Sequence, residues 1–422
     1  MIQNNKLVAI PLFACLLSAG VLAQDAAPVA QPVAVPVAVP VAVPVAVPVA
    51  NSTNDTARLL AGLAPSAAPE MVAITKESAW QQHAKFFDTA WERLEKSQLS
   101  KVRNWAGTNI PEAFAAKGTA FYMFSGPDFL YADTFFPQAS TYVLCGMEPT
   151  GAIPDVAKLT PKVLGGELHA LQESLNSVMS YSFFITKQMK DDFQNHSLSG
   201  TLPVLYIFLA RSGLTLTDVS YVSLDESGTL TSQPERNAKT SAPGVCIHFL
   251  AAGSNVKRTL YYFSTDISDG GLRKSGFLKF CKALAPGNGC VKSASYLMHE
   301  GNFSTIRGFL LDNIGTLVQD DSGIPISFFT PEVWQMRYFG AYPGPISLFK
   351  NCNQPKLTEA YRTSHPEPLE FGIGYRHHAG ESTLMVATRK PPGGNPVAPA
   401  AVPAKAAPPR ALIVPQAEAA TP

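Results

Sequence analysis

Residues 120–146 have the sequence AFYMFSGPDFLYADTFFPQASTYVLCG. Two short apolar runs, residues 120–124 and 141–146, enclose a stretch of helical length at residues 129–136. A strand, a helix and a second strand in this order form a β-α-β unit, which is typical of sheets covered by helices. The stretch therefore predicts an α/β fold.

The segments around this unit predict a mixed sheet. Apolar residues recur every three or four positions from Trp80 to Leu94 and from Leu168 to Met189, which indicates two long helices. Further strands are expected at residues 219–224, 245–250, 260–264, 291–298, 316–319, 345–349, 369–375 and 383–388, and further helices at residues 277–284 and 303–312 and after Pro331. We expect a mixed, largely three-layer α/β body with helices on both faces of the sheet.

Two related halves could make up this body. The first β-α-β unit leads to MEPTGAIP at residues 147–154, and a later one leads to DDSGIP at residues 320–325. Both segments contain an acid, a glycine, an isoleucine and a proline in that order. An ancient duplication and a chance match are both open.

The N-terminus has the features of a secretory signal peptide. Lys6 supplies positive charge, residues 7–22 are apolar, and residues 21–23 offer a cleavage site after Ala23. We expect residues 1–23 to be removed on export to the periplasm or the extracellular space. An uncleaved anchor is the alternative, whereas a lipoprotein signal at Cys15 is disfavoured by the bulky Phe13.

Low-complexity segments flank the body. Proline recurs every four residues from Pro32 to Pro48, and proline favours an extended rod because it fixes φ and lacks a backbone donor. We expect a disordered Pro/Val/Ala-rich spacer at residues 24–69, a globular body at residues 70–390 and a disordered Pro/Ala-rich tail at residues 391–422. No apolar run after the leader approaches the ~20 residues that span a bilayer, so no span is expected in the mature chain.

Charge and cysteine usage narrow the function classes. The chain has 33 basic and 32 acidic residues, and this balance argues against a nucleic-acid partner, which needs a basic face. Five cysteines remain after the leader. A disulfide between Cys281 and Cys290 is the most plausible pair, because the turn-forming residues 285–289 (APGNG) separate them. Cys145 and Cys246 lie in apolar runs and are expected to be buried thiols.

Polar side chains follow the predicted strands. In open α/β sheets, ligands bind beyond the carboxyl ends of the strands, where loops project side chains. The residues at these positions are Ser125, Asp128, Glu148, Asp266, Asp269, His299, Asp320 and Asp321. We therefore predict that acids, a hydroxyl and one histidine gather along one edge of the sheet.

Each of these residues also has a structural interpretation. Asp128 could cap the following helix, which is the commonest role of aspartate at such a position. Asp266 and Asp269 could be solvated turn residues, as could Glu148, and His299 could be a structural histidine. The adjacent pair Asp320 and Asp321 is different, because neighbouring carboxylates repel each other unless a cation, an arginine or water separates them.

Metal-assisted hydrolysis is the first functional interpretation. Asp128, Asp266 and Asp320 would hold a divalent metal that polarises an ester or phosphoester, and His299 and Asp321 would complete the catalytic set with Asp128 and Asp320. Ser125, Glu148 and Asp269 are further candidates. The spacing matches no known motif, so this interpretation depends on the predicted gathering at the sheet edge.

A non-catalytic periplasmic module that binds a sugar or a peptide is the alternative. Its partner would be a small-molecule or cell-envelope ligand, held against late aromatic residues. These are Trp334, Tyr338, Phe339, Tyr342 and Tyr375, which could instead belong to the core. Nucleotide cofactor binding ranks last, because Gly-x-Gly-x-x-Gly is absent from the first β-α-β unit.

Three short phrases carry a resemblance. The segments FSGPD at residues 124–128, YFS at residues 262–264 and QDDSG at residues 319–323 resemble those of an uncharacterised group of exported bacterial proteins. The similarity spans most of the body and implies a single body instead of two unrelated domains. It implies no activity and transfers no catalytic residue.

Overall fold

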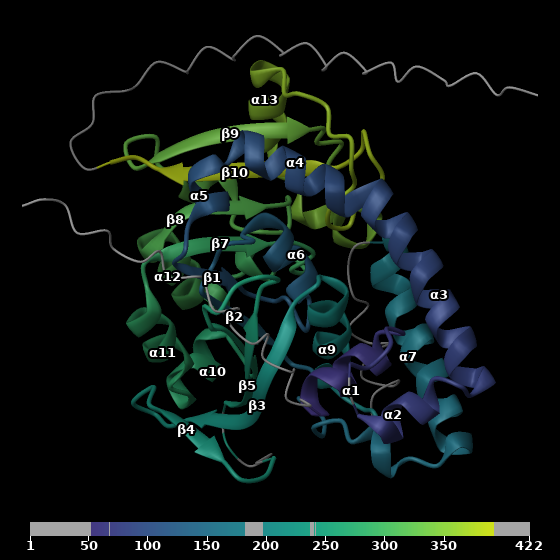
Figure 1. Ribbon diagram of the computed structural model, residues 1–422. Coiled ribbons are helices and arrows are strands. Elements are labelled where there is room, and N and C mark those ends of the chain that lie inside the picture. Colours follow the sequence, from purple (N-terminus) through teal and green to yellow (C-terminus); the bar gives the residue numbers. More distant parts are fainter. Residues whose placement is uncertain (1–51, 67, 182–196, 237–239, 241, 392–422) are drawn as a thin grey trace, which may run out of the picture. The chain divides into compact units, whose positions relative to one another are not determined.

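The computed structural model describes residues 52–66, 68–181, 197–236, 240 and 242–391. These residues form a ten-stranded mixed sheet with helices packed on it (Figure 1), so the predicted α/β class is confirmed. The predicted leader, most of the predicted spacer and nearly all of the predicted tail lie outside the described residues. None of the described helices is long and apolar enough to cross a bilayer.

The elements have the following bounds. The helices are α1 (Ser52–Leu60), α2 (Pro69–Ile74), α3 (Ser78–Leu94), α4 (Ser100–Asn109), α5 (Pro111–Ala115), α6 (Phe129–Phe135), α7 (Pro161–Tyr181), α9 (Thr201–Arg211), α10 (Asp269–Lys274), α11 (Phe277–Leu284), α12 (Ser304–Asn313) and α13 (Pro355–Ser364). The strands are β1 (Thr119–Tyr122), β2 (Thr141–Gly146), β3 (Thr215–Leu224), β4 (Leu230–Gln233), β5 (Pro243–Leu250), β6 (Arg258–Ser264), β7 (Gly287–Val291), β8 (Ile314–Gln319), β9 (Trp334–Gly340) and β10 (Thr383–Arg389).

The strand order places parallel pairs in the middle of the sheet. The order is β4-β3-β5-β6-β2-β1-β7-β8-β10-β9, and the strands from β6 to β8 pair in parallel. The pairs outside this block are antiparallel. The unit β1-α6-β2 extends to one side of the central β1–β7 pair, and β7-α12-β8 extends to the other side. The chain direction across the sheet therefore reverses at β1 and β7.

Alternating side chains of the central strands supply two cores, one on each face of the sheet. Ala120 and Tyr122 belong to the core that contains residues of α6 and α9, whereas Phe121 and Met123 belong to the core that contains residues of α11 and α12. This separation follows from the two-residue period of a strand. Figure 1 shows α10, α11 and α12 on one side of the central strands and α6 and α9 on the other. The crossovers β1-α6-β2 and β7-α12-β8 use opposite faces, as right-handed connections in opposite directions require.

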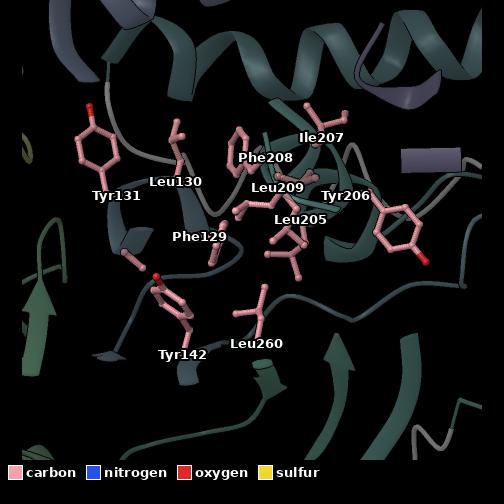
Figure 2. Packing of buried hydrophobic residues seen from close by; sticks show 14 of the residues in the cluster. Phe129, Leu130, Tyr131, Tyr142, Leu205, Tyr206, Ile207, Phe208, Leu209 and Leu260 are labelled. Atoms are coloured by element: carbon pink, nitrogen blue, oxygen red, sulfur yellow. The ribbon is translucent and has the colours of Figure 1, made fainter. Parts of the chain in front are cut away.

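Helix α9 lies inside one of these cores and was not expected from the sequence. Its residues from Thr201 to Ala210 are all buried, so the helix has no polar face and no amphipathic period to reveal it. Figure 2 shows Leu205, Phe208 and Leu209 of this helix near Phe129 and Leu260. Burying one such side chain contributes about 1.5–3 kcal/mol to folding.

The folded body begins before the predicted boundary at Glu70. Helix α1 buries Leu59 and Leu60 in the core shared with α9, so the spacer prediction is wrong for residues 52–66. A buried carboxylate fixes this segment: Asp55 accepts hydrogen bonds from the backbone N–H of Ser66 at 2.6 Å and of Ala68 at 3.1 Å. The prediction was wrong because it extended the low-complexity character of the proline repeat to the residues of α1, which are not part of that repeat.

Several predicted elements of the body are confirmed and others are wrong. The strand at residues 141–146 and the helix at residues 277–284 have the predicted bounds. The strand predicted at residues 291–298 is wrong, because β7 ends at Val291. The short helix predicted after Pro331 is wrong, since β9 begins at Trp334. The strands predicted at residues 345–349 and 369–375 are wrong as well: the first region forms a 3-10 turn, and the second only an isolated bridge.

The predicted disulfide between Cys281 and Cys290 is wrong. Both are free, buried thiols, and Cys281 of α11 faces one core whereas Cys290 of β7 faces the other. Residues 285–289 do not form a hairpin, because β7 already begins at Gly287. The sheet therefore separates the two sulfur atoms.

Candidate functional site

A pocket of about 260 Å³ lies where the chain direction reverses, at the carboxyl ends of β1, β2, β6 and β7. Connections leave β1 and β7 in opposite directions, and such a point in an open α/β sheet leaves a crevice in which ligands bind. We call this feature the strand-end pocket. Its polar lining includes Ser125, Asp128, Glu148, Asp266, Lys292 and Ser293.

Four of the predicted site residues meet in the strand-end pocket. Ser125 and Asp128 come from the loop after β1, Glu148 from the loop after β2, and Asp266 from the loop after β6. The prediction that polar residues after different strands gather at one edge therefore describes these four correctly. Asp269, His299, Asp320 and Asp321 are not among the residues that line the pocket.

A buried ion pair joins the loops after β1 and β7. The Nζ atom of Lys292 lies 2.8 Å from Oδ2 of Asp128, and both side chains are almost fully enclosed, at 1% and 2% exposure. Tyr122 donates its hydroxyl to the same oxygen at 2.9 Å. Desolvation raises the pKa of Tyr122, and the charge of Asp128 acts in the same direction, so the phenol remains a donor. The pair is compensated, as a charge removed from water requires.

The capping interpretation of Asp128 is also confirmed. Its Oδ1 atom accepts a hydrogen bond from the backbone N–H of Tyr131 at 3.3 Å, at the start of α6. The ring of Tyr131 then lies 4.3 Å below the Nζ atom of Lys292, measured to the ring centroid. One aspartate thus caps a helix and holds the lysine among aromatic rings.

Glu148 occupies the space left by two glycines. Its side chain is 4% exposed, and a Cβ atom at Gly146 would lie 2.2 Å from its Oε2 atom. Gly126, which has a φ of 54°, also adjoins this carboxylate, since a Cβ atom there would lie 3.4 Å from Oε2. Tyr262 donates its hydroxyl to the backbone oxygen of Glu148 at 2.7 Å. The carboxylate is therefore held at the wall of the pocket.

Left-handed backbone follows Lys292. Ser293, Ser295 and Tyr296 have φ values of 50°, 51° and 55°, which are unusual for residues with a side chain. Each such conformation costs of order 1–3 kcal/mol and persists only where surrounding contacts impose it, most often at functional sites. The strain ends the strand that the sequence predicted through Met298.

Side chains beyond β8 impose this conformation by binding the backbone N–H groups of the loop. Ser293 donates to Oδ2 of Asp320 at 2.8 Å. The two following residues are held in the same way: Ala294 donates to Ser322 Oγ at 2.8 Å, and Ser295 donates to Tyr375 Oη at 3.0 Å. These three hydrogen bonds consequently hold the loop that forms this wall of the pocket in one conformation.

The hydroxyl of Ser293 has no such partner. Its Oγ atom is buried and makes no hydrogen bond with any part of the chain that the structure describes. Buried hydroxyls are normally hydrogen-bonded, so an exception in the lining of a pocket points to a ligand or solvent contact.

Asp320 and Asp321 are buried carboxyl groups outside the pocket lining. Burial raises the pKa of both carboxyls, and the charge of Asp320 helps to raise that of Asp321 to about 7. Ser322 donates both its N–H and its hydroxyl to Oδ1 of Asp320. Tyr296 donates its hydroxyl to Oδ2 of Asp321 at 2.5 Å. Hydrogen-bond donors thus surround the two carboxyl groups, and the positive charges of Lys292 and Arg376 act on them as well.

His299 and Asp269 have structural surroundings. The ring of His299 packs edge-on to Tyr296 with centroids 5.1 Å apart, and burial lowers the pKa of this imidazole. Asp269 accepts hydrogen bonds from Ser304 Oγ at 2.7 Å and from the N–H of Thr305 at 2.8 Å, and so stabilises the start of α12.

Two of the three predicted metal ligands, Asp128 and Asp266, line the strand-end pocket, whereas Asp320 is not part of its lining. Across the described ranges, no group of three or more histidine, cysteine, aspartate or glutamate side chains is placed to hold a metal ion. Asp128 is paired with a lysine, Asp266 is exposed and accepts hydrogen bonds from Ser268, and Asp320 binds backbone N–H groups. These three acids do not provide the ligand set that metal-assisted hydrolysis needs.

Three of the five late aromatic residues are buried, which agrees with the core interpretation that the sequence left open. Trp334, Phe339 and Tyr342 are buried in three different hydrophobic clusters, so they are core residues. Tyr375 stacks on Tyr296, with ring centroids 6.2 Å apart. The aromatic rings of the strand-end pocket come instead from earlier in the chain and include Phe124 and Phe303.

Sequence reasoning missed Lys292 and Ser293. A lysine directly after the apolar run that ends at Val291 was the available signal, because a buried strand seldom contains one. The signal was overlooked because the strand was extended to residue 298.

No protein-family model, curated protein or solved structure matches this chain. The choice of function therefore depends on the geometry of the strand-end pocket.

Proposed function

We propose that the strand-end pocket binds a small hydroxyl-rich ligand about the size of one sugar ring. The buried, unpartnered hydroxyl of Ser293 carries this proposal, because it leaves a hydrogen bond for a bound molecule to complete. This function corresponds to the ligand-binding alternative inferred from the sequence. We further propose that the protein performs it after export, on a small-molecule or cell-envelope ligand.

The charges of the lining support a ligand with hydroxyl groups. Asp128 and Lys292 are paired with each other, and Glu148 and Asp266 supply two further carboxylate acceptors. Acceptors outnumber donors, so a ligand that donates several hydrogen bonds complements the wall. A polyanion would meet the excess of negative charge and is disfavoured.

The apolar part of the lining suits the carbon face of such a ligand. The rings of Phe124 and Phe303 pack edge to face with centroids 5.7 Å apart. Met147, which is 55% exposed, belongs to the same lining. A mainly apolar wall with a few placed polar groups is typical of small-molecule sites.

The volume of the strand-end pocket limits the size of the ligand. About 260 Å³ is below the roughly 300–1,000 Å³ of sites for drug-sized molecules, so a single ring or a very short peptide is the upper limit. Metal-assisted hydrolysis has less support, because the described residues include no group of three acids, histidines or cysteines placed to hold a metal ion.

Thermal denaturation with a panel of monosaccharides, polyols and dipeptides tests the proposal. We expect at least one hydroxyl-rich compound to raise the midpoint temperature in a saturable way, since binding to the folded state alone stabilises it. A panel that leaves the midpoint unchanged at millimolar concentrations contradicts the proposal.

A matched pair of serine variants locates the binding. Ser293→Ala should weaken the affinity for the selected compound about 2–10-fold, which is the contribution of one hydrogen bond. Ser275 is the control, because its hydroxyl is also buried without a partner among the described residues but lies outside the pocket lining. Equal effects of Ser293→Ala and Ser275→Ala on the dissociation constant, measured by calorimetric titration, would place the ligand elsewhere.

A further inference from the structure

We propose that Lys292 binds the carbonyl group of an aldehyde or ketone covalently, as an imine, in the strand-end pocket. This inference rests on the proposed binding function and names the ligand class more closely, as a small hydroxylated carbonyl compound. The observation behind it is the position of an amine and a carboxylate, both withdrawn from water, among the residues that line the pocket.

The surroundings of Lys292 are those of a desolvated amine. Its side chain is 1% exposed, and its Nζ atom lies 4.3 Å and 5.9 Å from the ring centroids of Tyr131 and Tyr122. A lysine used only to bind surface anions would lie in solvent. Desolvation is one of the ways in which proteins make a lysine nucleophilic towards carbonyl groups.

Asp128 is placed to move the protons of this step. Its Oδ2 atom is 2.8 Å from Nζ of Lys292, within the distance for direct proton transfer. Tyr122 and the N–H of Tyr131 fix the orientation of the carboxyl group through its two oxygens. Transfer of one proton from the ammonium group of Lys292 to Asp128 frees the nitrogen lone pair.

The reaction balances without any further reactant. The nitrogen attacks the carbonyl carbon, the C=O bond breaks and a C=N bond forms. The carbonyl oxygen leaves as one water, whose two hydrogens come from the ammonium group by way of Asp128. The iminium ion keeps the third hydrogen and the positive charge, so Asp128 remains its counterion. Ser293, whose hydroxyl has no partner among the described residues, is the donor for the carbonyl oxygen before it leaves.

Reductive trapping tests the inference on the unaltered protein. The chain is incubated at neutral pH with dihydroxyacetone and sodium cyanoborohydride, digested, and mapped by mass spectrometry. Lys257, an exposed lysine outside the pocket lining, is the internal reference. We expect Lys292 to be labelled roughly tenfold or more faster than Lys257, because a positioned acid–base group assists it. Labelling of Lys292 at or below the rate of Lys257 would overturn the inference, and no variant has to fold for this comparison.

A matched pair of aspartate variants separates proton transfer from general stability. Asp128→Asn should slow the labelling of Lys292 about tenfold or more. Asp133→Asn is the control, because Asp133 belongs to the same helix and faces Arg258 at 3.6 Å but is not part of the pocket lining. Labelling of Lys292 slowed equally by both variants would show that helix stability, not Asp128, sets the rate.

The outcomes distinguish this inference from the proposed function. A ligand that raises the midpoint temperature while Lys292 stays unlabelled leaves the binding function standing and removes the imine. Selective labelling of Lys292 without a thermal shift from any non-carbonyl compound supports the imine and restricts the ligand class to carbonyl compounds. Failure of both measurements removes both proposals.

Discussion

Lys292 and Asp128 follow different strands, β7 and β1, and their charged groups meet at 2.8 Å under the strand-end pocket. The strands pair in parallel, with Tyr122 opposite Cys290, so both loops leave the sheet at the same edge. The pair is therefore a product of the sheet topology and joins the two β-α-β units at the point where they diverge. Its energetics can be measured directly.

Loss of Lys292 alone should destabilise the protein strongly. Lys292→Met leaves Asp128 buried without its counterion, which costs about 3–5 kcal/mol. Urea denaturation measures this loss as a lower midpoint. The double variant Lys292→Met/Asp128→Asn should recover much of it, because no uncompensated charge remains. A loss of stability in the double variant equal to the sum of the losses in Lys292→Met and Asp128→Asn would contradict this coupling.

Asp321 should make stability depend on pH. Its pKa is raised to about 7, above the value near 3.9 of an unfolded aspartate, so the folded state binds more protons between about pH 4 and pH 7. The contribution of this group is therefore full below about pH 4 and is lost as the pH rises through about 7. Asp321→Asn should gain in relative stability over the wild type as the pH rises across this window.

The measurement is the difference in free energy of unfolding between the wild type and Asp321→Asn at several pH values. The difference is used because other groups titrate nearby: burial raises the pKa of Asp133 to about 6 and lowers that of His83 to about 4. A difference that stays constant with pH would show that the pKa of Asp321 in the folded protein is not raised.

Gly146→Ala should reduce both stability and ligand affinity. The new methyl group would lie 2.2 Å from Oε2 of Glu148 and 3.0 Å from the backbone of Gly126, so the glutamate has to move. Overpacking of this kind costs about 1–3 kcal/mol. Gly118→Ala is the control, because a Cβ atom there meets nothing within 4 Å. Thermal midpoints and dissociation constants of the two variants check the prediction, and equal values would refute it.

The cysteines should differ sharply in reactivity. Burial raises the pKa of Cys145 to about 12 and raises those of Cys281 and Cys290 as well, so these thiols remain protonated and enclosed. Cys352 is partly exposed and should react first with a thiol reagent under native conditions. A non-reducing peptide map that contains a Cys281–Cys290 bridge would contradict the separation of these residues by the sheet.

The sequence predicted those parts of the fold in which the local pattern and the tertiary surroundings agree. The strand at residues 141–146 and the helix at residues 277–284 are bounded by turn residues and carry clear apolar patterns, and both were predicted correctly. Helix α9 and strand β9 were missed for opposite reasons. The first is apolar on every side, and the second was assigned to a short helix after a proline.

The sequence predicted where the candidate site lies in the sheet, but it did not predict which side chains contact one another there. The rule that ligands bind beyond the carboxyl ends of strands identified Ser125, Asp128, Glu148 and Asp266. It could not show that Asp320 lies outside the pocket lining and binds the N–H of Ser293, because that depends on the strained backbone after Val291. Lys292 was missed for the same reason.

The anchoring of this loop makes the pocket a property of nearly the whole body. Tyr375, which holds Ser295 in place, comes long after Phe303, the last residue in sequence that lines the pocket. A chain cut short after β8 would retain every lining residue and still lose the hydroxyl that shapes one wall. Ligand preference should therefore respond to changes near the end of the folded chain, which gives selection or engineering a means to retune the pocket without touching its surface.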